Sequence, residues 1–453
     1  MNFLVCTLFV VIFLIEYVTG LGIVSRYAIL IPEMFSAIAV LMIFARLVAG
    51  RGMAIRSKYL AALGVLALIM LIGIVAQGVA SGTIIAGMRG YLKYLPFFLL
   101  PAVYDFSDRQ LKVQFSVLAV LLVIQTPLTV YQRFVEYVSR MHTGDYIIGT
   151  LSTASSLSLL VMCAIAMIMV LYLRRKIGIF VMAVCAAVIL VPATINETKA
   201  TLLLFPVVLI APMFFMPNRR VVLRKFLPIV AMGSLALVVF VGVYDYLATF
   251  SPYTQSVSEY LTDDESATTF YLYTGASSID QYGYVGRADS LVLAYQHALQ
   301  DPFRFAFGLG IGNVNTSVVS SFSGEYAVYG VRHGSELTQI SHFIWEVGFL
   351  GLALYLMIFF MMYRDARWLA SRNDFMGILG QFWSTSMLVM VFALLYARIF
   401  DFNEIGYIFW FYSGLVASKR YRLSRKEATE TAASAPARSD ELEDSLTITS
   451  SPA

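Results

Sequence analysis

The chain has 453 residues, of which 59% are apolar and only 13% are charged, and its mean hydropathy is +0.77. A soluble protein of this size needs roughly a quarter charged residues to cover its surface, so a soluble globular enzyme is excluded. The formal net charge of +4 says little by itself about nucleic acid. The three cysteines lie singly in apolar runs, where neither a disulfide nor a zinc cluster is expected. The composition therefore predicts an all-α polytopic membrane protein.

About twelve apolar runs follow one another along the chain. A helix needs about 20 mostly apolar residues to cross the hydrocarbon core of a bilayer. The first run lacks a basic leading region and a small-residue cleavage site, which favours a span over a signal peptide. The fourth and twelfth runs are short, and the fourth carries two prolines. The predicted spans are 3–19, 27–48, 59–80, 91–104, 113–132, 157–173, 177–195, 200–216, 224–244, 340–363, 376–397 and 402–417.

The distribution of lysine and arginine predicts the orientation. One set of alternating loops holds sixteen basic residues, whereas the other holds ten although it includes a loop of about 95 residues. Basic residues are retained on the cytoplasmic side, so both termini are expected there. The predicted organisation is spans one to nine in 1–244, a non-cytoplasmic loop domain in 245–339, spans ten to twelve in 340–417 and a cytoplasmic tail in 418–453. The tail is poor in apolar residues and is expected to be disordered.

The long loop combines acidic and aromatic residues. It holds ten acidic residues against three arginines, which argues against docking to nucleic acid or to anionic lipid. It also holds sixteen aromatic side chains between Tyr246 and Tyr329. These are expected to pack a small domain and to line the membrane interface, with stacking on sugar rings as an additional role.

Two motifs stand out in this loop. The segment RADSLVLAYQHALQDP predicts an amphipathic helix, capped by Asp289 or Ser290, ended by Pro302, and lying on the membrane surface or against the bundle. The segment GLGIGN, 308–313, has no following Lys-Ser/Thr and no preceding strand, so it is not a nucleotide-binding loop. It predicts a tight turn that brings the backbone close to another group.

Histidines and charged residues gather on the predicted outer side. Each could simply lie near a helix end and reach water, but charges at membrane depth tend to line a cavity or pathway. Together they predict a polar outer cavity between helices. The histidines are His142, His297, His333 and His342, and the charged residues are Glu16, Glu33, Lys93, Glu197, Lys199, Arg398, Asp401 and Glu404.

Three of the outer residues suggest a chemistry. Lys199 begins the eighth span, Arg287 begins the amphipathic helix and His342 lies where the loop re-enters the membrane. Fixed cations beside an imidazole could bind a pyrophosphate and activate a hydroxyl, because histidine ordinarily titrates near neutrality. A histidine at a helix start can also serve only as a cap.

The order of these motifs resembles the O-antigen ligase and O-antigen polymerase superfamily. The matching features are the basic residue at the start of span eight, Gly-Arg at the head of a loop helix that ends in Pro, Gly-Leu-Gly-x-Gly, and a His followed by Glu-x-Gly-x-x-Gly. They cover roughly 190–360, and the twelve-span layout extends the resemblance to most of the chain. The family often has Asn after the His and Trp in the loop helix, where this chain has Phe343 and Leu291 or its neighbours.

The resemblance implies a glycosyltransferase at the periplasmic face of a bacterial inner membrane, working without a metal or another cofactor. Its donor would be a glycan on undecaprenyl pyrophosphate. His342 would be the base or activator, and Arg287 would hold the pyrophosphate, with Lys199 and Arg398 beside it. Lys199 stands where the family commonly has arginine, so it keeps the charge but loses the bidentate fork.

The acceptor remains open at this stage. A second lipid-linked repeat unit would make the protein a polymerase of O-antigen or exopolysaccharide, which is the preferred interpretation, and lipid A–core would make it a ligase. A lipid-linked oligosaccharide flippase is a third alternative, although the sequence lacks the related halves typical of transporters. A sugar transferase with a catalytic Asp in its first outer loop is disfavoured, because 20–26 has no acidic residue. The expected partners are the two glycans, the bilayer and a chain-length regulator or flippase, and no nucleic acid.

Overall fold

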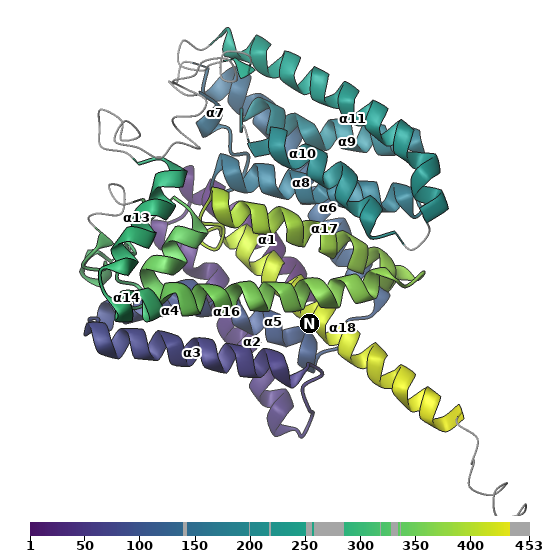
Figure 1. The fold of residues 1–453 in the computed structure, drawn as a ribbon. Helices are drawn as coiled ribbons and strands as arrows, with labels where there is room; N and C mark the ends of the chain where they lie inside the picture. Colours follow the sequence, from purple (N-terminus) through teal and green to yellow (C-terminus); the bar gives the residue numbers. More distant parts are fainter. Residues whose placement is uncertain are drawn as a thin grey trace, which may run out of the picture.

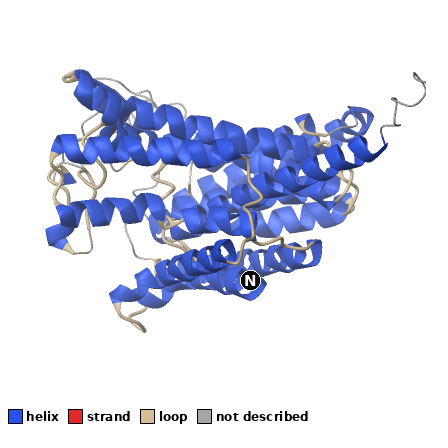
Figure 2. Ribbon diagram, turned by 90° about the horizontal axis from the view of Figure 1, so that it is seen from below, coloured by secondary structure: helices blue, strands red, loops and turns tan. Residues whose placement is uncertain are grey.

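The structure is a computed structural model that describes residues 1–138, 143–198, 200–216, 219–250, 256–257, 285–317, 319–327, 334–335 and 337–434. Across these ranges the regular elements are helices, without a strand, and most run side by side in one bundle (Figure 2). The main helices are α1 (Asn2–Gly20), α2 (Ile31–Val48), α3 (Ser57–Gln77), α4 (Ser81–Leu92), α5 (Leu95–Val103), α6 (Asp108–Tyr131), α8 (Ala154–Leu173), α9 (Ile179–Ile195), α10 (Ala200–Phe214), α11 (Arg219–Ala248), α13 (Arg287–Leu299), α14 (Pro302–Phe307), α16 (Gln339–Ala370), α17 (Phe375–Tyr396) and α18 (Asn403–Ser434). Shorter elements are η1 (Arg26–Leu30), η2 (Gln132–Glu136), α7 (Thr143–Tyr146) and η3 (Ser320–Phe322).

Eight helical segments are long and apolar enough to cross a membrane, among the described residues. This confirms the prediction of a helical membrane protein, while the number of twelve spans and the long loop stay predictions. The helices α9 and α10 are also apolar but shorter. The eight segments are Asn2–Gly20, Arg26–Val48, Ser57–Gln77, Asp108–Glu136, Ala154–Leu173, Arg220–Ala248, Gln339–Ala370 and Phe375–Tyr396.

The core of the bundle lies around α16, α17 and α8. Most residues of these three helices are buried inside the protein, whereas only a minority of the residues of α11 and α6 are buried. Helices α9, α10 and α11 form one side of the bundle and α3 the opposite side, with α16 between them (Figure 1). Exposed leucine, isoleucine and valine on the outer helices are expected of surfaces that face lipid rather than water.

The predicted fourth span, 91–104, is broken in the structure. Helix α4 begins well before this run and ends at Leu92, and α5 then begins at Leu95. Pro96 lies in the first turn of α5, where a missing N–H costs nothing, and such a proline favours the start of a new helix. The break leaves Lys93 and Tyr94 between two half-helices in the interior of the bundle.

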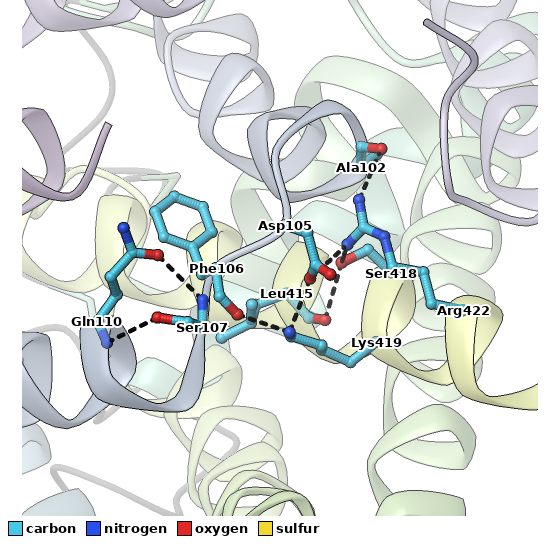
Figure 3. Close-up of polar contacts among 9 residues, drawn as sticks. All are labelled: Ala102, Asp105, Phe106, Ser107, Gln110, Leu415, Ser418, Lys419 and Arg422. Carbon is cyan, nitrogen blue, oxygen red and sulfur yellow. Dashed lines mark hydrogen bonds and ion pairs between the residues drawn. The ribbon is translucent and has the colours of Figure 1, made fainter.

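The tail predicted to be disordered, 418–453, is helical from its start to Ser434, so that prediction is wrong for 418–434. Basic side chains of this segment contact the rest of the protein. Lys419 and Arg422 pair with Asp105 and also donate to the backbone carbonyls of Phe106 and Ala102 (Figure 3). These contacts, together with good helix-forming residues, extend α18 out of the bundle (Figure 1). Residues 435–453 lie outside the described part.

The described part of the long loop packs against the bundle. Helix α13 begins at Arg287 with Gly286 as its N-cap, and Asp289 and Ser290 are buried in its first turn rather than capping it. Pro302 starts the next helix, α14. Both helices pack on α16, at the end of the bundle away from the projecting α18 (Figure 1). Most of the aromatic segment, 258–284, lies outside the described residues, so sugar stacking there stays a prediction.

Candidate functional site

A polar cavity of about 460 Å³ opens where α4, α13, α16 and the segment after α17 meet. The size lies within the range of small-molecule sites. The cavity is at the end of α16 opposite to its basic residues Arg364 and Arg367, which the charge distribution predicts to be cytoplasmic. The sequence-based prediction of a polar cavity at the outer ends of the helices therefore has a counterpart in the structure.

Positive charge dominates the wall of this cavity. Its described lining includes four cations, Arg89, Lys93, Arg287 and Arg398, and one carboxylate, Asp401. The helices α13 and α16 also begin at the cavity, and a helix N-terminus carries partial positive charge. The arrangement favours an anionic ligand.

Neighbouring groups hold these cations in place. The Arg287 Nε donates to the carbonyl of Tyr396 at 2.7 Å, and its guanidinium lies 4.4 Å from the centre of the Tyr396 ring. An Arg398 terminal nitrogen donates to Asn315 Oδ1 at 2.6 Å and pairs with Asp401 at 2.9 Å. Because their directions are fixed in advance, little side-chain freedom remains to be lost when a ligand binds.

The remaining cations come from the broken helix α4–α5. Lys93 Nζ donates to Asn403 Oδ1 at 2.9 Å, at the start of α18. Arg89 pairs with Glu33 of α2. The break between α4 and α5 therefore supplies half of the positive charge of the cavity.

His342 lies in the first turn of α16 and lines the cavity with only 4% of its surface exposed. Its ring stacks at 17° on Tyr91 of α4, with centroids 6.3 Å apart. The cap of α16 is Thr338, whose side chain accepts from the backbone N–H of Ser341. His342 is therefore not needed as the cap.

Glu346 lies one turn after His342 and is fully buried. Its Oε2 is 3.3 Å from His342 Nε2. Its Oε1 accepts from the backbone N–H of Gly312 and from the side-chain amide of Asn315, both at 2.8 Å. Asn315 also contacts Arg398, so one carboxylate is connected to both the imidazole and a cation of the cavity.

The loop 308–313 is the tight turn that the sequence predicts. Gly308, Gly310 and Gly312 have φ values of 71°, 84° and 86°, which side chains rarely adopt. Each also lies against a glycine of a different helix, and the partners are Gly348, Gly73 and Gly87 respectively. A Cβ added to Gly312 would lie 2.2 Å from the carbonyl oxygen of Thr83. Paired glycines thus allow the loop to enter the bundle and reach Glu346.

Three of the four predicted site residues lie in this one cavity. These are His342, Arg287 and Arg398, which come from three separate parts of the chain. Lys199 lies outside the described residues. The sequence did not single out Arg89, Asn315 or Glu346 as site residues, although Glu346 is the acidic residue of the Glu-x-Gly motif.

The other outer residues have different surroundings. Glu197 forms a buried ion pair with Arg133 at 2.6 Å, between η2 and the turn after α9. Glu404 accepts from the Ser152 hydroxyl at 2.6 Å. His297 faces the ring of Trp345, with centroids 4.3 Å apart. His142 and His333 lie outside the described residues.

No protein-family model and no curated protein matches the chain.

Proposed function

We propose that the protein is a glycosyltransferase that joins lipid-linked oligosaccharide repeat units at the outer face of a bacterial inner membrane. The donor is a glycan on undecaprenyl pyrophosphate, and the acceptor is a second lipid-linked repeat unit. The observation that carries the proposal is one cavity among membrane-spanning helices that combines four cations with a buried histidine. The resemblance of the motifs around Arg287 and His342 supports the same assignment.

The chemistry of the cavity suits a diphosphate leaving group. Arginine and lysine stabilise the negative charge that develops on the diphosphate as its bond to the sugar breaks. A site built into the membrane bundle also lets the long lipid tail remain among the helices while the charged group enters the cavity.

The proposed reaction is a single displacement. The acceptor hydroxyl oxygen forms a bond to the anomeric carbon of the donor, and its proton passes to His342 and then to water. The bond between the anomeric carbon and the diphosphate oxygen breaks, and its electron pair stays on the undecaprenyl pyrophosphate that leaves. Arg287, Arg398 and Lys93 stabilise this charge, and a positioned general base contributes about 10²–10⁴-fold to such a reaction.

The test is glycan analysis of a deletion strain complemented with the wild type, His342→Ala or Arg287→Ala. We expect both variants to accumulate lipid-linked single repeats and to lose long chains, with the protein level unchanged. Arg304→Ala is the matched control, because Arg304 lies in α14, outside the cavity lining, and pairs only loosely with Asp301 at 4.0 Å. The control should retain long chains.

The other outcomes separate the alternatives. Long chains that accumulate on undecaprenyl pyrophosphate, without transfer to lipid A–core, would identify a ligase. Repeats that stay on the cytoplasmic side would identify a flippase. Normal glycans from both variants would refute an enzymatic role for this cavity.

A further inference from the structure

The carboxylate of Glu346 has two oxygens in two different environments. We infer that Glu346 is a positioning residue: Oε1 anchors the loop 308–315, while Oε2 fixes the proton of His342 on Nε2. The inference rests on the proposed function, since it concerns the histidine assigned there to proton transfer. It assigns a role to Glu346 and a protonation form to His342, neither of which follows from the sequence motifs alone.

The first oxygen is occupied by N–H donors. Oε1 accepts from Gly312 N and from Asn315 Nδ2, each at 2.8 Å. Two donors directed at one buried position require an acceptor there, because an N–H group in that place would leave both donors unsatisfied. Whatever residue stands at 346 must therefore place an oxygen at this point if the loop is to stay in position.

The second oxygen faces the imidazole. Oε2 lies 3.3 Å from His342 Nε2. The other ring nitrogen, Nδ1, is buried and makes no hydrogen bond to the described part of the chain. A neutral imidazole has its proton on one nitrogen only. A proton on Nε2 lies beside the carboxylate, within ion-pair distance of Oε2, whereas a proton on Nδ1 would be a buried donor without an acceptor, so the structure favours the Nε2–H form.

Other titratable groups surround His342 from the elements packed against it. Tyr91 of α4 stacks on the imidazole, and its hydroxyl interacts with Glu346. The charged groups of the cavity wall are Arg89, Lys93, Arg287, Arg398 and Asp401, and the tyrosines Tyr355 and Tyr396 also line it. Among the described residues, Glu346 is the carboxylate at ion-pair distance from the ring. The charges of the wall influence the imidazole, but Glu346 directs its proton.

The substitution Glu346→Gln separates the two roles. The amide has one oxygen and one NH₂ group. If the oxygen remains at the Oε1 position, where two donors need it, the NH₂ group takes the place of Oε2 and points at His342 Nε2. The proton of the imidazole must then move to Nδ1. The loop is retained, and only the protonation form of His342 changes.

We expect Glu346→Gln to lower kcat for elongation of lipid-linked repeats by about 100-fold or more, since inverting the form of a catalytic histidine costs about 10⁴ where it has been isolated. KM for the lipid-linked donor should change little, because the cations of the cavity are untouched. Glu325→Gln is the matched control, because Glu325 is exposed and lies outside the cavity lining. It should keep wild-type kcat and KM.

Nitrogen NMR of the histidine-labelled protein in detergent tests the inference without any activity. The chain has four histidines, and the signal of His342 is identified by its loss in His342→Ala. At a pH where the ring is neutral, we expect the proton on Nε2 in the wild type and on Nδ1 in Glu346→Gln. A wild-type proton on Nδ1 overturns the inference even if the variant does not fold.

The two possible failures can be told apart. If the wild type shows the Nε2–H form but elongates no lipid-linked glycan, the proposed function fails and the role of Glu346 in fixing the imidazole stands. If the wild type elongates glycan and Glu346→Gln does so equally well with an unchanged proton position, the inference about Glu346 fails and the proposed function stands.

Discussion

The contact between Gly87 of α4 and the loop 308–313 allows a quantitative test of the structure. A Cβ added to Gly87 would lie 2.4 Å from the backbone nitrogen of Gly312 and 2.6 Å from the carbonyl carbon of Ile311. Both are backbone atoms, which cannot rotate away, so Gly87→Ala must displace the loop or α4. Overpacking of this kind costs about 1–3 kcal/mol. Alanine also has a higher helix propensity than glycine, so the same substitution stabilises the helix by about 1 kcal/mol.

A second glycine-to-alanine variant in the same helix has the same gain in helix propensity, so this gain cancels when the two variants are compared. Gly90 lies in the same helix, and a Cβ added there meets nothing within 4 Å. We therefore expect Gly87→Ala to be less stable than Gly90→Ala by about 1–3 kcal/mol, the overpacking term alone. The assay is thermal unfolding of the purified protein in detergent, followed by fluorescence. Equal melting temperatures for the two variants would refute the close approach of α4 to the loop. Because the loop bears the N–H groups that reach Glu346, Gly87→Ala should also lower glycan elongation.

Three further substitutions test the polar contacts of the bundle. Arg133→Ala removes one ion-pair partner of the buried carboxylate of Glu197 and should cost up to about 3–5 kcal/mol, whereas the double substitution Arg133→Met with Glu197→Leu should recover most of this loss. Thermal unfolding in detergent checks the result, and equal stability of the single and double variants would contradict it. Asp365→Asn removes the charge of a fully buried carboxylate that contacts Arg56, Arg420 and Tyr59, so it should lower the melting temperature clearly. Asp105→Asn, by contrast, breaks the ion pairs of a carboxylate that is 60% exposed and should cost about 1 kcal/mol or less. A larger loss of stability in Asp105→Asn than in Asp365→Asn would contradict the burial of these two groups.

The sequence predicted the helices because apolar length alone largely determines them in a membrane. The runs at 3–19, 59–80 and 376–397 correspond closely to α1, α3 and α17. The prediction of helices was less accurate in segments that are not continuously apolar. The broken α4–α5 contains small and polar residues such as Gly87 and Arg89, and only the neighbouring helices explain why such a segment is helical inside the bundle. The helical start of the tail depends in the same way on distant acidic partners, Asp105 and Asp365.

The candidate site was predictable as far as single motifs allow. His342 and Arg287 lie in the first turns of α16 and α13, and a helix start beside a membrane is a place where a charged side chain can reach a cavity. The hydrogen bonds of Glu346 were not predictable, because Gly312 and Asn315 lie more than thirty residues earlier in the chain. The tight spacing of His342 and Glu346 is nevertheless a usable signal, since residues four apart on a helix face the same side.

The cations of α4 show how the broken helix and the cavity depend on each other. Arg89 and Lys93 are four residues apart, so they face the same side of the chain and reach the same cavity. Helix α4 ends at Leu92 and α5 begins at Leu95, so Lys93 and Tyr94 line the cavity from the break itself. In the membrane, an interrupted helix is tolerated where it is buried in protein or lines a polar space. Pro96, in the first turn of α5, therefore accounts both for the weakness of 91–104 as a span and for the interruption from which Lys93 enters the cavity wall.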